Sequence, residues 1–252
     1  MNQATRFRYI LDRLAEQDSV DVEDLVTTLG VSAATVRRDL EKLHDQRLLE
    51  RRHGGAVALS GVYELPLRYR GSLRSEEKLR IARAAMDHVH NGTTVALTGG
   101  TTTTEVGRML NHRSDVTVVT NAINIAAELA VRPNIRLIMS GGVARAASYE
   151  LTGPLAEDVL GQLNVEVIFL GVDGITAAAG TTTHDEVEAR TNRVMAERAE
   201  KVIVVADGTK VGKTALARIC EIGAVSLLIT SHGADATELA ALKAAGVRVQ
   251  TV

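Results

Sequence analysis

Apolar residues in the first 58 positions recur at intervals of three and four, the spacing of helices. Three such stripes follow one another: Phe7, Ile10, Leu11 and Leu14; Val22, Leu25, Val26 and Leu29; and Ala33, Val36, Leu40 and Leu43. Gly30 follows the second stripe, where a helix commonly ends, and Ser32 is a favourable N-cap for the third helix. Residues 48–57 carry Gly54-Gly55 between short apolar patches, which indicates a two-stranded wing. The pattern predicts helices followed by a hairpin.

From about Thr93 the period changes to short, nearly continuous apolar runs. Seven of them are rich in β-forming residues: TTVAL, VTVVT, IRLIM, VEVIFLG, KVIVVA, SLLIT and VRVQT. Helical stretches separate most of them, at 102–111, 122–131, 154–162, 184–198 and 235–245, and a further helix is expected over 76–89. Such alternation favours a parallel sheet covered on both faces. We therefore expect an α/β protein, with a winged helix-turn-helix domain over 1–58, a linker over 59–74 and a doubly wound, mainly parallel-sheet domain over 75–252.

Composition narrows the function classes. Aromatic residues make up 2% of the 252-residue chain, and there is no Trp, so stacking on nucleobases is a poor candidate for the main mode of recognition. The single Cys220 excludes an intramolecular disulfide and a cysteine metal site. No apolar run is long enough for a membrane helix, and the first residues lack the apolar core of a signal peptide. We expect a soluble, cytoplasmic protein without metal or cofactor.

The third helix carries basic side chains opposite its apolar stripe. The net charge of −2 argues mildly against a DNA-binding protein, but DNA binding needs only a local basic surface. A bundle with solvated arginines is the alternative interpretation. The glycine turn, the N-cap, the paired arginines and a basic wing occur in order, and this order favours insertion of the helix into the major groove. The candidate DNA-binding residues are Ser32, Thr35, Arg37, Arg38, Lys42, Arg51, Arg52 and His53.

The loops after the predicted strands are rich in glycine and hydroxyl groups. These loops are TGGTTTT at 98–104, TNA at 120–122, SGG at 140–142, GVDG at 171–174 and DGTK at 207–210. Glycine lets backbone N–H groups approach an anion, and a helix N-terminus adds positive potential. Each loop alone is explained by tight turns, but the carboxyl edge of a parallel sheet is the usual ligand site. Together the loops indicate a site for a phosphorylated polyol.

The run LGVSAATVRRDLEKL followed by RRHGGAV resembles the DeoR family of bacterial transcriptional regulators, and the resemblance extends over nearly the whole chain. It implies that the first domain binds double-stranded operator DNA. It also implies that the second domain is similar in fold to sugar-phosphate isomerases and binds a phosphorylated sugar or a related metabolite as effector. The expected protein is a repressor of carbohydrate-metabolism genes, relieved by a phosphorylated sugar or amino sugar.

The resemblance also assigns residues to the effector. Gly100-Thr101-Thr102 matches the family's phosphate loop, and Asp207, Thr209 and Lys210 match a late D-x-[ST]-K motif. Thr98 stands where the family often has Asp, so no particular effector is carried over. The full candidate set is Arg70, Lys78, Thr98, Gly99, Gly100, Thr101, Thr102, Thr120, Asn121, Gly141, Gly142, Asp173, Asp207 and Lys210.

The sequence also leaves enzymatic alternatives open. Residues 207–214 nearly match a nucleotide-binding loop, but Asp207 stands at the first glycine position and would oppose a triphosphate. A sugar-phosphate isomerase is the stronger alternative, with Asp173, Glu186 or Asp207 as base. His184-Asp185-Glu186 is better explained as an anionic helix cap than as a metal site, and Cys220 as a core residue. Binding without catalysis is favoured. The expected assembly is a homodimer or homotetramer joined through the larger domain.

Overall fold

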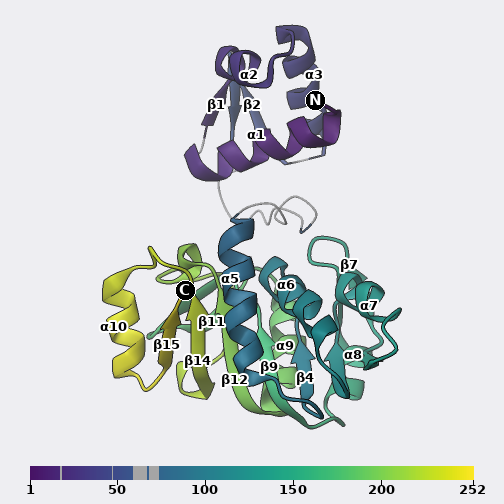
Figure 1. Cartoon of the computed structure of the whole chain (residues 1–252). Coiled ribbons are helices and arrows are strands. Elements are labelled where there is room, and N and C mark those ends of the chain that lie inside the picture. The colour runs from purple at the N-terminus through teal and green to yellow at the C-terminus, as the bar shows by residue number, and fades with distance from the viewer. Residues whose placement is uncertain (18, 47, 59–66, 68–73) are drawn as a thin grey trace. The chain divides into compact units, whose positions relative to one another are not determined.

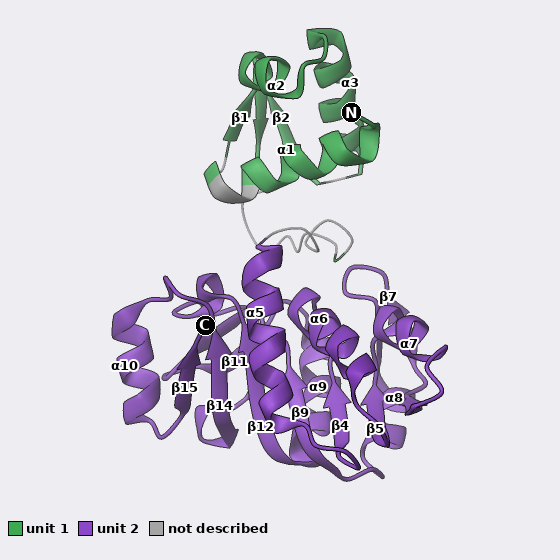
Figure 2. Cartoon of the chain, in the orientation of Figure 1, with its two compact units in different colours: residues 1–73 green, residues 74–252 purple. Residues whose placement is uncertain are grey.

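The computed structural model describes residues 1–17, 19–46, 48–58, 67 and 74–252. The chain divides into two compact units, Met1–Leu73 and Arg74–Val252, here called the N-terminal and C-terminal units (Figure 2). Each unit has its own core.

The N-terminal unit is a small helical domain with a short sheet. Its elements are α1 (Gln3–Gln17), β1 (Ser19–Asp21), α2 (Val22–Leu29), α3 (Ala33–Asp45), β2 (Glu50–Arg52) and β3 (Gly55–Val57). The three apolar stripes form its core as predicted, except that Val26 and Ala33 are only partly buried. Gly30 ends α2 in the left-handed conformation with φ 64°, and the Ser32 hydroxyl caps α3 by accepting from the Thr35 N–H. The helix-turn-helix is therefore confirmed.

The wing differs from its prediction because it has three strands instead of two. β1 pairs antiparallel with β3, and β3 pairs with β2, in the order β1-β3-β2. A Cβ on Gly55 would lie 2.0 Å from the Val20 carbonyl oxygen, so this close strand pairing requires glycine there. β1 contains three residues, of which only Val20 is apolar. Such a segment is too short for alternation to predict a strand.

A seven-stranded parallel sheet forms the centre of the C-terminal unit, and every predicted β-rich run lies in it. The strands are β4 (Thr94–Leu97), β5 (Val116–Thr120), β6 (Ile135–Met139), β9 (Val165–Leu170), β12 (Ala199–Ala206), β14 (Val225–Thr230) and β15 (Arg248–Thr251). Their order is β15-β14-β12-β9-β4-β5-β6. β5 and β6 extend from β4 in one direction, while β9 and the later strands extend in the other. The order therefore reverses between β4 and β9.

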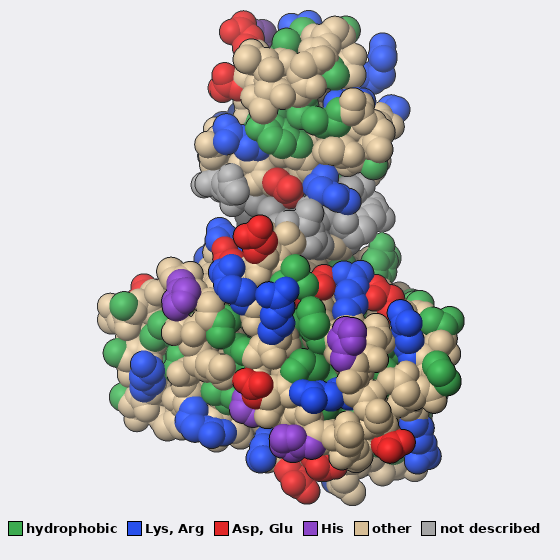
Figure 3. Space-filling view, in the orientation of Figure 1, with side chains coloured by type: hydrophobic (Ala, Val, Ile, Leu, Met, Phe, Trp, Pro, Cys, Tyr) green, Lys and Arg blue, Asp and Glu red, His purple; other side chains and the backbone are tan. Residues whose placement is uncertain are grey.

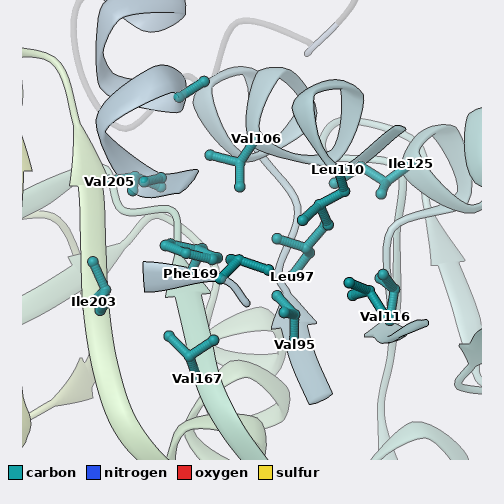
Figure 4. Close-up of a cluster of buried hydrophobic side chains, with 14 of the residues drawn as sticks. Val95, Leu97, Val106, Leu110, Val116, Ile125, Val167, Phe169, Ile203 and Val205 are labelled. Atoms are coloured by element: carbon teal, nitrogen blue, oxygen red, sulfur yellow. The ribbon is translucent and has the colours of Figure 1, made fainter. Parts of the chain in front are cut away.

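Helices cover both faces of this sheet (Figure 1). They are α5 (Ser75–Ala85), α6 (Thr101–Met109), α7 (Ile123–Leu129), α8 (Pro154–Leu160), α9 (Glu186–Glu197) and α10 (Ala236–Ala244), and the short 3₁₀ turns are Met86–His88, Leu110–His112, Gly208–Lys210 and Ile222–Ala224. One face packs Val95, Leu97 and Phe169 against α5, α6 and α7 (Figure 4). The other face packs Ala96 and Ile168 against α8 and α9. This alternation confirms the doubly wound α/β fold.

Two small sheets lie outside the predicted elements. β7 (Val143–Arg145) and β8 (Glu150–Thr152) form a hairpin after β6. β10 (Gly174–Thr176), β11 (Gly180–Thr183) and β13 (Ala217–Cys220) form an antiparallel sheet beyond β9. Within the described residues, no helix has both the length and the apolar character needed to cross a membrane.

Candidate functional sites

The outer face of α3 is basic and exposed. Arg37, Arg38 and Lys42 are all exposed, while the opposite face of the helix is buried in the unit's core. The Thr35 hydroxyl is 2.9 Å from the Ser32 hydroxyl, so both side chains also fix the start of the helix. This arrangement leaves long cationic side chains available for a DNA groove, on a helix whose position is set by its other face.

Asp39 anchors the buried side of α3. Its carboxylate accepts from Arg6 Nε at 2.5 Å and from Gln3 Nε2 at 3.1 Å, and its side chain is 2% exposed. The hydrogen bond to Asp39 raises the pKa of the Arg6 guanidinium, which keeps that side chain charged. The ion pair joins α1 to α3. Helical periodicity did not reveal it, because Asp39 interrupts an apolar face with a charge whose partner is 33 positions away.

The wing carries the remaining candidate DNA contacts. Arg51 and Arg52 lie in β2 and His53 begins the turn to β3, and all three are exposed. In the register of the sheet Arg51 faces Ala56 and Arg52 faces Gly55. Because successive strand residues point to opposite faces, the two arginines cannot both lie on the same side of the wing.

In the C-terminal unit, the loops after β4 and β9 meet at the reversal of strand order. The Thr98 hydroxyl accepts a hydrogen bond from the Gly171 N–H at 3.0 Å and donates to the Gly99 carbonyl at 3.3 Å. A Cβ on Gly171 would lie 2.6 Å from the Gly99 carbonyl oxygen, so the two loops are in close contact. This is the point of an open α/β sheet where ligands commonly bind.

The loop after β4 opens directly into α6. Gly100 is the N-cap of α6, and no side chain of the described residues caps its first turn. The hydroxyls of Thr103 and Thr104 turn inward and donate to the Gly100 carbonyl. The first N–H groups of the helix, from Thr101 onward, therefore have no side-chain acceptor among the described residues. They form an anion-binding geometry of the kind that phosphate groups use.

Glu150 lies beneath this loop, and the sequence did not indicate it. Its Oε1 accepts from the Gly99 N–H at 2.8 Å, from Asn121 Nδ2 at 3.2 Å and from Asn192 Nδ2 at 3.1 Å. The side chain is 1% exposed, and a Cβ on Gly99 would lie 2.4 Å from its Cγ. Its three donors come from the loops after β4 and β5 and from α9. The available sequence signals were the acid at the start of a short strand and the polar Asn192 on the buried face of α9.

Lys210 and Asp173 begin a second polar network. Lys210 Nζ lies 3.1 Å from Asp173 Oδ1, and the Thr183 hydroxyl lies 3.1 Å from Asp173 Oδ2 and 2.7 Å from Glu188 Oε1. Arg145 of the β7–β8 hairpin then bonds Glu188 at 3.2 Å and Asp185 at 3.0 Å. The structure therefore brings together Asp173 and Lys210, two of the residues proposed for the effector. Thr183, Glu188 and Arg145 were missed, because their contacts join distant segments.

Asp185 caps α9, as the sequence predicted. Its Oδ1 accepts from the N–H groups of Val187 and Glu188. Burial by itself would raise the pKa of Asp185, but these N–H groups and the Arg145 guanidinium outweigh it and hold the pKa below its ordinary value. The anionic helix cap is therefore the correct interpretation of the His184-Asp185-Glu186 run.

The DGTK segment forms a 3₁₀ turn. Asp207 caps it by accepting from the Thr209 N–H, and the Thr209 hydroxyl also bonds this carboxylate. The Gly208 N–H donates to the Ser231 hydroxyl at 2.9 Å, and this hydroxyl donates to Glu77 Oε2 of α5 at 2.5 Å. The loop after β12 is thus hydrogen-bonded to the first helix of the C-terminal unit.

Other predicted effector residues occupy different places. Thr120 is fully buried and donates to the Leu97 carbonyl, so its hydroxyl joins the ends of β4 and β5. Gly141 and Gly142 precede the β7–β8 hairpin, and Lys78 is buried on α5 at 3% exposure. Arg70 lies outside the described residues. Cys220 is buried, as predicted, and burial raises the pKa of its thiol.

The surface over α5 is mixed in charge. Figure 3 shows Lys and Arg side chains gathered on this face with acidic groups among them. Arg80 and Arg83 are exposed on α5, and Glu76 is exposed near its start. A mixed surface of this kind does not by itself attract a polyanion, so the α3 face and the wing remain the basic surfaces of interest.

Comparison with known proteins places both units. Residues 6–62 match the model of the DeoR-like helix-turn-helix domain, and residues 73–232 match that of the DeoR C-terminal sensor domain. The chain is 36% identical over 250 residues to the HTH-type transcriptional regulator GlpR of Haloferax volcanii, covering 99% of this chain and 98% of that protein. It is 34% identical over 230 residues to the glycerol-3-phosphate regulon repressor of Escherichia coli K12, covering 91% of each.

Among solved structures, ribose 5-phosphate isomerase from Plasmodium falciparum aligns with a TM-score of 0.40 at 16% identity, over 53% of this chain and 51% of that one. The family models together span both units, and the relatives align along nearly the whole chain. The chain thus belongs to the DeoR family of DNA-binding transcriptional regulators.

Proposed function

We propose that this regulator represses genes for the uptake or breakdown of a carbohydrate, and that a phosphorylated sugar bound to the C-terminal unit releases it from DNA. The observation that carries the proposal is that two features suited to a phosphorylated sugar lie in loops after strands of the parallel sheet. These are the uncapped start of α6, after β4, and the Lys210–Asp173 pair, from the loops after β12 and β9. The name of the relative from E. coli K12 contains glycerol 3-phosphate, a phosphorylated polyol, which supports this ligand class.

The phosphate would bind at the start of α6. The N–H groups of Gly100–Thr102 would donate to its oxygens, and Lys210 would supply a positive charge after exchanging Asp173 for the phosphate. Asp173 would then accept hydrogen bonds from the sugar hydroxyls, and Asn121 would accept or donate them. Such a ligand rearranges the Lys210–Asp173 pair. Because of this rearrangement, the ligand binds more tightly to one conformation of the C-terminal unit than to another.

The hydrogen bonds of Ser231 offer a route from this site to the rest of the chain. Ser231 links Gly208, two residues before Lys210, to Glu77 in the first turns of α5. α5 is the first helix after the segment that precedes the C-terminal unit. We propose that a ligand-induced shift of the DGTK turn moves Glu77 through Ser231. Buried Lys78, the next residue, belongs to the same responsive turn.

The protein is proposed to act as a homodimer or homotetramer joined through the C-terminal unit. One short recognition helix makes few base contacts, so paired half-sites are the usual solution. Leu155 and Val159 lie one turn apart on α8 and are 68% and 38% exposed, and Val143 of β7 is 71% exposed. These apolar side chains are candidates for a self-association surface. Sedimentation that shows only monomer, both free and on DNA, would contradict this assembly.

The test measures release of an operator fragment, selected by the native protein from random-sequence DNA, during titration with phosphorylated sugars. Lys210→Ala should raise the ligand concentration needed for release about 10- to 100-fold, because a charge-assisted bond to phosphate is lost. Lys213→Ala is the matched control, since Lys213 is exposed and lies three residues away. Equal responses of the Lys210→Ala variant and the native protein would exclude Lys210 as a ligand contact.

The same titration tests the enzymatic alternative. Each phosphorylated sugar that releases DNA is recovered and analysed for isomerisation. We propose that it returns unchanged, because Asp173 is paired with Lys210, Asp207 caps its own turn and Glu186 is exposed at the start of α9. Recovery of an isomerised product in catalytic amounts would contradict the sensor function and identify the protein as a sugar-phosphate isomerase.

A further inference from the structure

Glu150 differs from three other acidic side chains near the ligand site, each of which is paired with a cation. Asp173 is paired with Lys210, while Asp185 and Glu188 are paired with Arg145. Among the described residues, no Lys, Arg or His comes within ion-pairing distance of the Glu150 carboxylate, which is 1% exposed. A carboxylate buried without a positive partner is unfavourable, because the interior replaces its hydration poorly. The site therefore contains a buried carboxylate that pairs with no Lys, Arg or His of the described residues.

The hydrogen bonds of Glu150 are also one-sided. All three N–H donors, from Gly99, Asn121 and Asn192, bind the same oxygen, Oε1. Oε2 has no hydrogen-bond partner among the described residues. The side-chain oxygen of Asn121 is likewise buried and without a partner, because the amide uses its nitrogen for Glu150 and Asn192. The cluster presents two acceptors and needs donors.

Glu150 also constrains where a phosphate can bind. The Gly99 N–H already donates to Glu150 Oε1, and the carboxylate would repel a second anion at that position. A phosphate is therefore limited to the N–H groups that follow, at the start of α6, while the part of the ligand next to Glu150 has to donate hydrogen bonds. A positively charged donor satisfies both Glu150 Oε2 and the missing countercharge, whereas a hydroxyl satisfies only the hydrogen bond.

We propose that Glu150, with Asn121, recognises an ammonium group, so that the effector is a phosphorylated sugar with a free amino group. This proposal rests on the proposed function of the C-terminal unit as a sugar-phosphate sensor, and it narrows the ligand class. Asn192 acts as a positioning residue, since its side-chain amide donates to Oε1 and so holds the Glu150 carboxylate in place.

The experiment compares ligands that differ only at the amino position. Binding of glucosamine 6-phosphate, glucose 6-phosphate and N-acetylglucosamine 6-phosphate to the full chain is measured by calorimetry, together with the three galactose counterparts. In at least one series, the free amine should bind about 10- to 100-fold more tightly than the hydroxyl and N-acetyl compounds. Glu150→Gln keeps the shape and should reduce this ratio to near one. Glu128→Gln, at a half-buried acid on α7 that is paired with Arg108, should leave the ratio unchanged.

Several outcomes would overturn the assignment. Equal affinities of amine and hydroxyl sugars in the native protein would do so, as would a preference that survives Glu150→Gln. If none of these sugar phosphates binds to the protein or causes it to release operator DNA, the proposed sensor function itself is wrong. That result is distinct from loss of the amine preference alone.

A second measurement needs no substitution, in case Glu150→Gln does not fold. Raising the pH past the pKa of the ligand's amine should weaken binding of the amino sugar and leave its hydroxyl counterpart unchanged. An amine preference that persists after deprotonation would contradict charge recognition by Glu150.

Discussion

In the N-terminal unit, the arginines of α3 assigned to DNA, Arg37 and Arg38, are exposed and have no hydrogen bond or ion pair to any described residue. In the C-terminal unit, the side chains around the proposed ligand are buried or half-buried and are held by hydrogen bonds or ion pairs, with Thr98 and Asn121 at 0% exposure and Lys210 at 27%. Both sets stand on a rigid framework, α3 in one case and the parallel sheet in the other.

The difference follows from the size of the partner. A DNA groove is reached from outside, so its contacts have to project from a helix whose opposite face is fixed in a core. A small molecule is surrounded, so its contacts have to be positioned beforehand by neighbouring side chains. A substitution in the first set should change recognition without changing the fold. A substitution in the second set should change several contacts at once.

The largest effect is expected from the exposed arginines of α3. Replacing Arg37 and Arg38 together with Ala should weaken binding to the selected operator about 100-fold or more, since each bidentate arginine contributes about 1–3 kcal/mol. The thermal unfolding curve should be unchanged, because neither side chain contacts the core. Fluorescence anisotropy of labelled operator measures the affinity. Arg132→Ala with Arg136→Ala removes two exposed charges from the C-terminal unit as a control, and an equal loss there would assign the effect to net charge.

The same contrast explains what the sequence could predict. The stripe Val36, Leu40 and Leu43 repeats within one helix, so its outward face, with Arg38, follows from local spacing. The seven parallel strands were equally predictable from the sequence, because each is a short, nearly continuous apolar run. Glu150 was not, because its partners Gly99 and Asn192 are 51 and 42 positions away. Local periodicity contains no information on contacts of that range, and it also missed three-residue strands such as β1.

A smaller effect is expected where the ligand site meets α5. Ser231→Ala removes the hydroxyl that joins Gly208 to Glu77 but leaves Lys210 and Glu150 in place. The affinity for an effector sugar phosphate, measured by calorimetry, should change less than about threefold. The concentration that releases DNA should rise about fivefold, which corresponds to loss of about 1 kcal/mol of coupling. Ser226→Ala, at the other end of β14, is the control.

A parallel change in affinity and release for Ser231→Ala would identify Ser231 as part of the ligand site rather than as a link to α5. No change in either quantity would exclude it from both roles.

The smallest effect concerns the anionic cap of α9, and it is visible only through pH. Because the pKa of Asp185 lies below its ordinary value of 3.8 in the folded protein, its charge stabilises the fold at higher pH, and this contribution is lost as the pH falls through the lowered pKa. Asp185→Asn keeps a good N-cap but removes the charge that faces Arg145. Near pH 7 the variant should be less stable by less than about 1 kcal/mol, since the side chain is 27% exposed. Urea unfolding at a series of pH values should show this difference shrinking below pH 3.8. Asp158→Asn removes an exposed charge on α8 for comparison. A stability difference that stays constant with pH would mean that the shape of the cap, and not its charge, determines its contribution. Asp185 would then resemble the exposed arginines of α3, whose charges can be removed without a change in stability.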